Sequence, residues 1–150
     1  MASRKPRERL VARYHGENSS LPRPITETIT RSDGILKSGL WKTSFEERRC
    51  IVPADSFFEW KRLHKKTNPK YEITIPGREP FALAGIWSMW KNEAGNYVPT
   101  VSVITSEPNQ VVADIHDRQR VILEPRDYAE WFAPTARLHS IYCASSRLKQ

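Results

Sequence analysis

The chain has 150 residues, and its 24 lysines and arginines exceed its 17 aspartates and glutamates by seven, a net charge of +7. This length fits one domain, and a composition of 39% hydrophobic and 27% charged residues excludes a disordered chain. No apolar run reaches the roughly 18–20 residues of a membrane span, and the basic N-terminus lacks the apolar core of a secretory signal.

The charge and the two cysteines indicate the partner and the compartment. Lysine and arginine gain free energy by releasing counterions from phosphates, so the positive charge favours nucleic acid as a partner. Two cysteines are too few for a disulfide framework, which predicts a reducing cytosol. Exposed tryptophans would add stacking surfaces for unpaired bases. Trp87 and Trp90, however, are expected in the core.

The N-terminal half predicts a leader, one helix and two strands. Residues 1–24 are basic and contain proline, which indicates an irregular leader before a single folded domain over residues 25–150. Apolar residues over 35–47 have the spacing of a short amphipathic helix that Gly39 weakens. Two strands are then expected, a short buried one over 50–53 that a proline ends, and a second one over 56–63.

The C-terminal half predicts four more strands and two helices. The expected elements are a strand over 70–75 with a Pro76-Gly77 turn, a strand over 81–90 covered on both faces, a hairpin loop over 92–96, its partner strand over 97–105, helices over 111–115 and 124–132, and a closing strand over 141–144. Strands joined by short turns, with few helices, indicate an α+β fold with a mostly antiparallel, strongly curved sheet.

Glu59 is the first candidate catalytic residue, because it lies among the aromatic residues of the segment SFFEWKRL. A carboxylate in apolar surroundings is costly unless paired and tends towards a raised pKa, which suits a general acid or base. A solvent-facing position on the polar side of a strand is the alternative.

His116 is the second candidate, in the sequence Asp-Ile-His-Asp-Arg. Carboxylates on both sides could fix its tautomer, and Arg118 could clamp a phosphate. A surface or capping histidine is the alternative. The histidines and cysteines have no metal-ligand spacing, and no phosphate-binding glycine loop is present, so neither metal nor cofactor is expected. A Cys50–His116 nucleophile pair is formally possible, although Cys50 in an apolar strand reads as a small buried hydrophobe.

Three segments resemble the SOS-response-associated peptidase family, whose members sense abasic sites in single-stranded DNA. The segments are GLWKTSFEERRCIVPADSFFEW, PFALAGIWSMW and VSVITSEPNQVVADIHDRQRVIL. They keep the family's order and spacing, and the pairing of the Glu59 motif with the His116 motif is specific. The resemblance implies a β-barrel core with a few short flanking helices.

The resemblance also implies the chemistry and the site residues. An N-terminal cysteine, freed by removal of the initiator Met, would attack the ring-opened sugar and close a thiazolidine crosslink. Glu59 and His116 would move protons in Met removal and in crosslink reversal. Arg118 and Thr105 would contact DNA, as would Trp41, and Glu27 would lie near the abasic-site pocket.

The sequence departs from the family at its start and at two motifs. It begins Met-Ala-Ser-Arg instead of Met-Cys-Gly-Arg, and Cys50 is its first cysteine, so the crosslinking nucleophile is missing. Arg23 and Ile25 replace the asparagine and arginine of the family's pocket motif, and Arg120 stands where a proline is usual. The chain therefore resembles a member truncated or diverged at its N-terminus.

Four functions stay open, one of which is a Cys50–His116 protease that acts on other proteins and needs Cys50 exposed. The first is an abasic-site protein of the SOS response with impaired crosslinking, acting as a cytoplasmic, nucleoid-associated monomer on single-stranded DNA. The second is a non-catalytic nucleic-acid-binding module. A hybrid would use the α-amine of Ala2 to form a Schiff base without a thiol and give abasic-site lyase activity.

Overall fold

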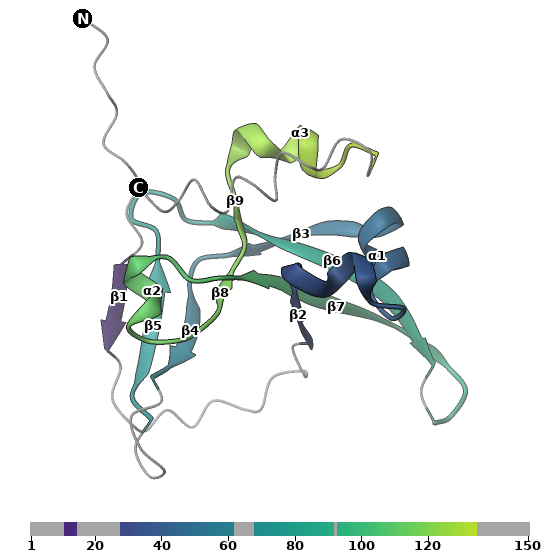
Figure 1. The fold of residues 1–150 in the computed structure, drawn as a ribbon, viewed down its shortest axis with the longest axis horizontal. Coiled ribbons are helices and arrows are strands. Elements are labelled where there is room, and N and C mark those ends of the chain that lie inside the picture. The colour runs from purple at the N-terminus through teal and green to yellow at the C-terminus, as the bar shows by residue number, and fades with distance from the viewer. Residues whose placement is uncertain (1–10, 15–27, 62–67, 92, 135–150) are drawn as a thin grey trace, which may run out of the picture.

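The computed structural model describes residues 11–14, 28–61, 68–91 and 93–134, which form two β-sheets with short helices (Figure 1). This confirms the α+β class and the predominance of antiparallel pairing. The described strands do not close into a barrel, and the barrel core stays a prediction. The closing strand expected over 141–144 lies outside the described residues.

The larger sheet has six strands in which only β2 runs parallel to its neighbour. Its main path is β2 (Thr28–Arg31), β7 (Tyr97–Ser106), β6 (Phe81–Lys91) and β3 (Arg49–Ala54), while the short β8 (Gln119–Arg120) and β9 (Ile122–Leu123) pair with β7 and β6. Between them, the amide of Val121 donates to Ile104 of β7, and its carbonyl accepts from Ala84 of β6, each over 2.9 Å. The β8–β9 segment is thereby bonded to both long strands.

The smaller sheet is antiparallel and orders β1 (Val11–Tyr14), β5 (Lys70–Thr74) and β4 (Phe57–Trp60). Strand β1 lies inside the segment that was predicted as an irregular leader, where it pairs with β5. Strand β4 was predicted over 56–63, and its alternation sends Phe57 into the core while Trp60 is exposed.

The inner half of β6, Phe81–Ile86, is buried on both faces, as its apolar run predicted. One face packs Ala84 and Ile86 under the helices, with Phe45 and Trp131 in the same cluster. The helices on this side are η1 (Ser32–Lys37), α1 (Lys42–Glu47), η2 (Pro125–Asp127) and α3 (Tyr128–Trp131). The other face packs against the three-stranded sheet and α2 (Gln110–Ala113), through residues such as Phe57 and Val112.

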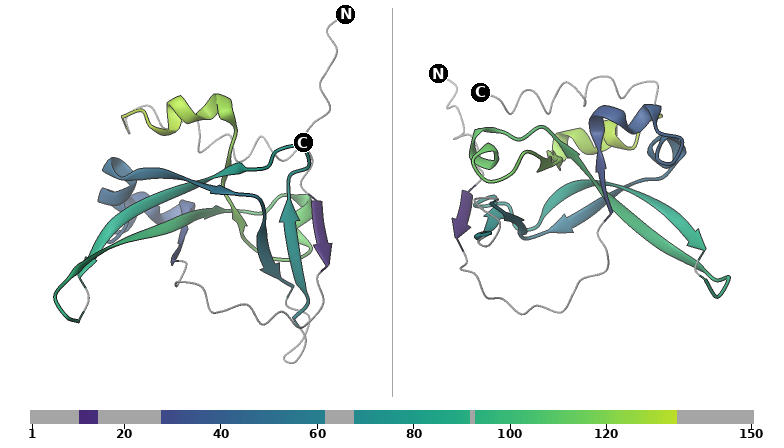
Figure 2. Two further views of the ribbon diagram at one scale, coloured as in Figure 1. Left: turned by 180° about the vertical axis from the view of Figure 1, so that it is seen from behind. Right: turned by 60° about the horizontal axis from the view of Figure 1, so that its bottom comes forward.

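The outer half of the hairpin formed by β6 and β7 projects beyond the other described elements in both views of Figure 2. Trp87 and Trp90 lie there with exposed fractions of 40% and 56%, so the expectation that they belong to the core was wrong. The run stays apolar past Ile86, but no second layer of described residues covers it.

The helix expected over residues 35–47 is broken into η1 and α1. The hydroxyl oxygen of Ser38 accepts from the amides of Leu40 and Trp41, both over 3.3 Å, and turns the chain between the two helices. Leu40 is left exposed as a result. Strand β3 likewise continues through Pro53 to Ala54, because β3 is an edge strand of its sheet.

Candidate functional site

A buried ion pair joins the two sheets. Arg120 of β8 donates through Nη1 to Oε1 of Glu59 in β4, and side-chain exposures are 9% and 12%. The same nitrogen lies 3.4 Å from the carbonyl oxygen of Phe58, and the guanidinium lies 4.7 Å from the ring centroid of Phe57. Burying two charges is offset only by such close pairing, so each side chain depends on the other.

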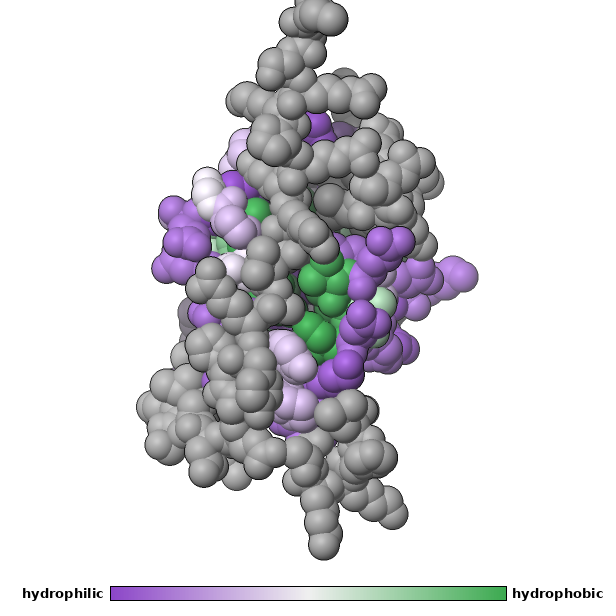
Figure 3. Space-filling view, turned by 90° about the vertical axis from the view of Figure 1, so that its left-hand side faces the viewer, coloured by the Kyte–Doolittle hydropathy of each residue, from purple (hydrophilic) through white to green (hydrophobic). Residues whose placement is uncertain are grey.

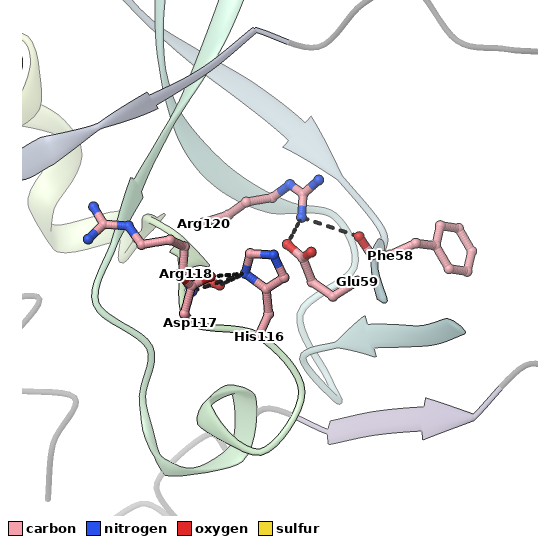
Figure 4. Close-up of polar contacts among 6 residues, drawn as sticks. All are labelled: Phe58, Glu59, His116, Asp117, Arg118 and Arg120. Atoms are coloured by element: carbon pink, nitrogen blue, oxygen red, sulfur yellow. Dashed lines mark hydrogen bonds and ion pairs between the residues drawn. The ribbon is translucent and has the colours of Figure 1, made fainter. Parts of the chain in front are cut away.

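His116 follows α2, whose start is fixed by a capping residue. Oδ1 of Asn109 accepts from the amides of Val111 and Val112 over 3.1 Å, and the Asn109 amide donates to Gln119 over 3.0 Å. This short loop returns the chain from α2 to β8 and carries His116 towards Glu59. In Figure 4 the imidazole points to the space beside the Glu59 carboxylate and the Arg120 guanidinium.

One ring nitrogen of His116 is held by its own loop. The amide of Arg118 donates to Nδ1 over 3.0 Å, and Oδ1 of Asp117 lies 3.1 Å from the same atom. The first contact needs an unprotonated Nδ1, while the second needs Nδ1 to carry a proton, so the two belong to different protonation states. In the first state Nε2 carries the proton and remains available to a ligand.

Arg118 does not extend freely into solvent. Its Nη2 donates to Oδ1 of Asp33 over 2.8 Å and to the carbonyl oxygen of Thr105 over 3.1 Å. Its Nε is a buried donor that meets no acceptor among the described residues. A hydrogen bond to its own backbone and the nearby Arg118 charge together hold the pKa of Asp33 below its usual 3.8, although partial burial opposes them.

The structure therefore brings two of the predicted residues together, Glu59 and His116, while the Arg118 side chain points away from them and is held by Asp33. Thr105 lies beside them, but its side chain is buried and its hydroxyl donates to the carbonyl oxygen of Thr30 over 3.4 Å. Trp41 packs against the core cluster beneath the helices instead of joining this group. Glu27 lies outside the described residues.

Cys50 lies in β3, where its backbone pairs with Gly85, and its carbonyl accepts from the indole of Trp131 over 3.0 Å. Burial raises the pKa of the Cys50 thiol above its usual value, which disfavours the nucleophilic thiolate. The described contacts of His116 lie within its own loop and do not include Cys50.

Sequence reasoning missed Arg120 and Asp33 as partners of the site. Arg120 is separated from Glu59 by 61 positions, and Asp33 from Arg118 by 85. The one available signal was the unusual arginine at position 120. A second omission is the exposed Trp60 of β4, where the Lys70 ammonium lies 3.8 Å from the Phe58 ring centroid and 5.7 Å from that of Trp60.

Among the described residues that are visible at the end carrying the smaller sheet, most are hydrophilic and a few apolar ones show between them (Figure 3). Within the described ranges, no three histidine, cysteine or acidic side chains gather as a metal site would require. The helices described here are all too short or too polar to span a membrane.

Comparisons with known proteins give a consistent result. The family model described as SOS response associated peptidase (SRAP) matches residues 10–147. Abasic site processing protein YoqW of Bacillus subtilis is 38% identical over 104 residues, which are 69% of this chain and 46% of that protein. Abasic site processing protein YedK of Escherichia coli is 32% identical over 101 residues, 67% of this chain and 45% of YedK.

A crystal structure of a Bacteroides thetaiotaomicron protein superposes with a TM-score of 0.65 and 26% identity, covering 75% of this chain and 51% of that one. A phage-related protein of Bordetella bronchiseptica superposes with a TM-score of 0.61 and 26% identity, over 87% of this chain and 62% of that one. The chain thus spans about half the length of the curated relatives it matches.

Proposed function

Because the chain belongs to the SOS response associated peptidase (SRAP) family, we propose that it binds abasic sites in single-stranded DNA and assists proton transfer there. The observation that carries this proposal is that Glu59 and His116 lie together beside Arg120 at the junction of the two sheets, with Arg118 on the same loop as His116. An acid–base pair beside a cation suits a ligand that combines a reactive aldehyde with phosphates.

Each residue has a separate role in this proposal. His116 in its protonated form donates the Nε2 proton while Nδ1–H faces Oδ1 of Asp117, which leaves a neutral imidazole. Glu59, ionised beside Arg120, accepts protons and orients groups on the sugar. Arg118 provides charge for a phosphate, which must replace Asp33 as the acceptor for Nη2.

The covalent step that these groups would assist is imine formation by a primary amine of the chain. The nitrogen adds to the aldehyde carbon of the opened sugar to form a carbinolamine, and a proton on its hydroxyl lets that oxygen leave as water. The nitrogen then loses its proton to a base. Closing a thiazolidine would need an adjacent thiol, and the burial that raises the Cys50 pKa argues against that thiol as the source.

Incubation with a single-stranded oligonucleotide that carries one natural abasic site tests both parts of the proposal. Borohydride reduces an imine to a stable secondary amine, so a trapped product would migrate with the DNA on a denaturing gel. We expect trapping that falls strongly in Glu59→Gln and in His116→Gln. Arg126→Gln is the matched control, because Arg126 is highly exposed on η2. A trapped yield that these site variants leave unchanged would reject the proton-transfer roles.

Binding without reaction is the second candidate, and the Glu59–Arg120 ion pair favours it. A carboxylate that is only 12% exposed and already paired is less available to a substrate. This candidate predicts that wild-type protein binds the abasic oligonucleotide, that Glu59→Gln binds equally well, and that borohydride traps nothing. The salt dependence of binding would still identify Arg118, since losing one phosphate contact lowers the log–log slope by about 0.7 for single strands.

A further inference from the structure

The outer half of the β6–β7 hairpin concentrates exposed apolar side chains. Six of the ten large hydrophobic residues that are exposed in the described ranges lie on this one hairpin. They are Trp87, Met89, Trp90, Tyr97, Val98 and Val101. Such a concentration on a projecting arm marks a surface for a ligand or partner.

Strand register divides this arm into two different faces. Trp87 pairs with Val101, Met89 with Pro99, and Lys91 with Tyr97, so alternation places these residues on one face. The opposite face carries Trp90 with Val98, and the hydroxyls of Ser88 and Thr100, which lie 3.0 Å apart.

Positive charge gathers on the first face. The Arg48 guanidinium lies 5.8 Å from the ring centroid of Trp87, and the Lys91 ammonium lies 5.9 Å from that of Tyr97. We call Arg48, Trp87, Met89, Lys91 and Tyr97 the cation–aromatic face. The two ring–cation pairs are separated by four residues of β6, or about 14 Å at 3.4 Å per residue.

We infer that the cation–aromatic face binds the unpaired bases of single-stranded DNA that flank the proposed abasic site. Flat aromatic rings stack on bases of any sequence, and interleaved cations attract the phosphates between them. The inference rests on the proposed function, because the lesion site anchors the same strand. Duplex DNA fits this face less well, since its bases already stack on one another.

The charge of the face argues against a second copy of the chain as its ligand. Two copies that met face to face would bring Arg48 and Lys91 against their own equivalents, on chains that each carry a net charge of +7. Like charges placed opposite one another oppose such pairing. A polyanion with aromatic bases satisfies both the rings and the cations.

The hairpin also lies within reach of a strand held at the proposed site. Thr105, whose carbonyl contacts Arg118, and Tyr97 are eight residues apart on β7, or about 27 Å at 3.4 Å per residue. Two nucleotides span about 7 Å at the B-form rise of 3.4 Å and about twice that in an extended single strand, which is still short of Tyr97. A long oligonucleotide can therefore reach the whole cation–aromatic face, whereas a five-nucleotide one with a central lesion cannot reach Tyr97.

Fluorescence anisotropy of the two oligonucleotides tests the inference. We expect Trp87→Ala/Tyr97→Ala to weaken binding of a 25-nucleotide abasic strand at least about tenfold, because stacking on each ring contributes substantially. Binding of the five-nucleotide strand, which cannot reach Tyr97, should weaken less than binding of the long strand. Trp90→Ala, on the opposite face of the same arm, is the matched control and should bind the long strand like wild type.

Four outcomes would overturn the inference. The first two are unchanged binding of the long strand by the double variant and an equal loss of binding in Trp90→Ala. The third is that the double variant loses binding to anionic phosphatidylserine vesicles but keeps binding to DNA. The fourth is that the double substitution converts a dimer to a monomer in sedimentation. If the double variant does not fold, Arg48→Gln/Lys91→Gln should show the same length-dependent loss. If wild type binds neither oligonucleotide, the proposed function itself fails, which is a distinct result.

Discussion

Two regions of the molecule place an arginine against an aromatic ring, with opposite surroundings. At the sheet junction Arg120 lies over Phe57 and pairs with Glu59, and all three side chains are nearly buried. At the hairpin Arg48, which follows α1, lies over the ring of Trp87, a residue that remains 40% exposed. The buried arginine is paired entirely with residues of the protein itself, whereas the exposed arginine and ring leave room for a ligand from outside.

Removing Arg120 from the buried pair should give the largest effect on stability. Arg120→Met leaves the Glu59 carboxylate buried without its partner, so we expect a loss of about 3–5 kcal/mol in the free energy of unfolding. Urea unfolding measures this loss. Adding Glu59→Gln should recover part of it through a coupling of about 1–3 kcal/mol. A loss from Arg120→Met below about 1 kcal/mol would mean that the junction is not held by this pair.

Truncating a side chain to alanine should cost much more free energy of unfolding in the inner half of β6 than in its outer half. Ile86→Ala removes a side chain that is 1% exposed, which should cost about 2–5 kcal/mol through lost burial and a cavity. Met89→Ala, three residues further along the strand, should change stability by less than about 0.5 kcal/mol. Comparable losses in urea unfolding would show that the hairpin is covered in solution.

Asp33 should make stability depend on acid pH. Its pKa in the folded chain lies below the usual 3.8, so the unfolded chain takes up the proton first as the pH falls. The stabilisation is therefore present above about pH 4 and is lost as the pH falls through the folded value. Melting temperatures at pH 6 and pH 3 should differ less in Asp33→Asn than in wild type. The exposed Asp55→Asn should keep the wild-type difference.

Thiol labelling gives the smallest expected effect and tests the protease alternative. In a Cys143→Ser background, Cys50 should react with a maleimide more slowly in the native than in the unfolded chain, because burial raises its pKa. Native labelling as fast as that of the unfolded chain would restore Cys50 as a candidate nucleophile.

Hydrophobic patterns in the sequence predicted some features of the fold correctly and others wrongly. The continuous apolar run of β6 correctly indicated cover on both faces as far as Ile86, because alternating residues there face two separate clusters. The same pattern failed at Trp87 and Trp90, since hydrophobicity records a residue's preference and not the presence of a second layer. The prediction of one continuous helix over 35–47 was wrong because the Ser38 side chain accepts hydrogen bonds from backbone amides and breaks the helix there.

The candidate site was predictable in part. Glu59 and His116 were identified from their motifs, but their convergence depends on how β4 and β8 meet across two sheets. Apart from the unusual arginine at position 120, nothing local identified the partners Arg120 and Asp33, because each lies far along the chain from the residue it contacts. From the sequence alone, charged residues such as these are expected to face solvent, and only the fold shows which of them are paired.

The most direct test of the central claim is competition for the chain between two single-stranded oligonucleotides of the same sequence. One carries a stable abasic analogue and the other an intact nucleotide at the same position. We predict that the abasic strand binds at least about tenfold more tightly, a difference of about 1.4 kcal/mol, and that Arg118→Gln weakens binding of both strands. Equal affinity for the two strands would contradict recognition of abasic sites by this chain.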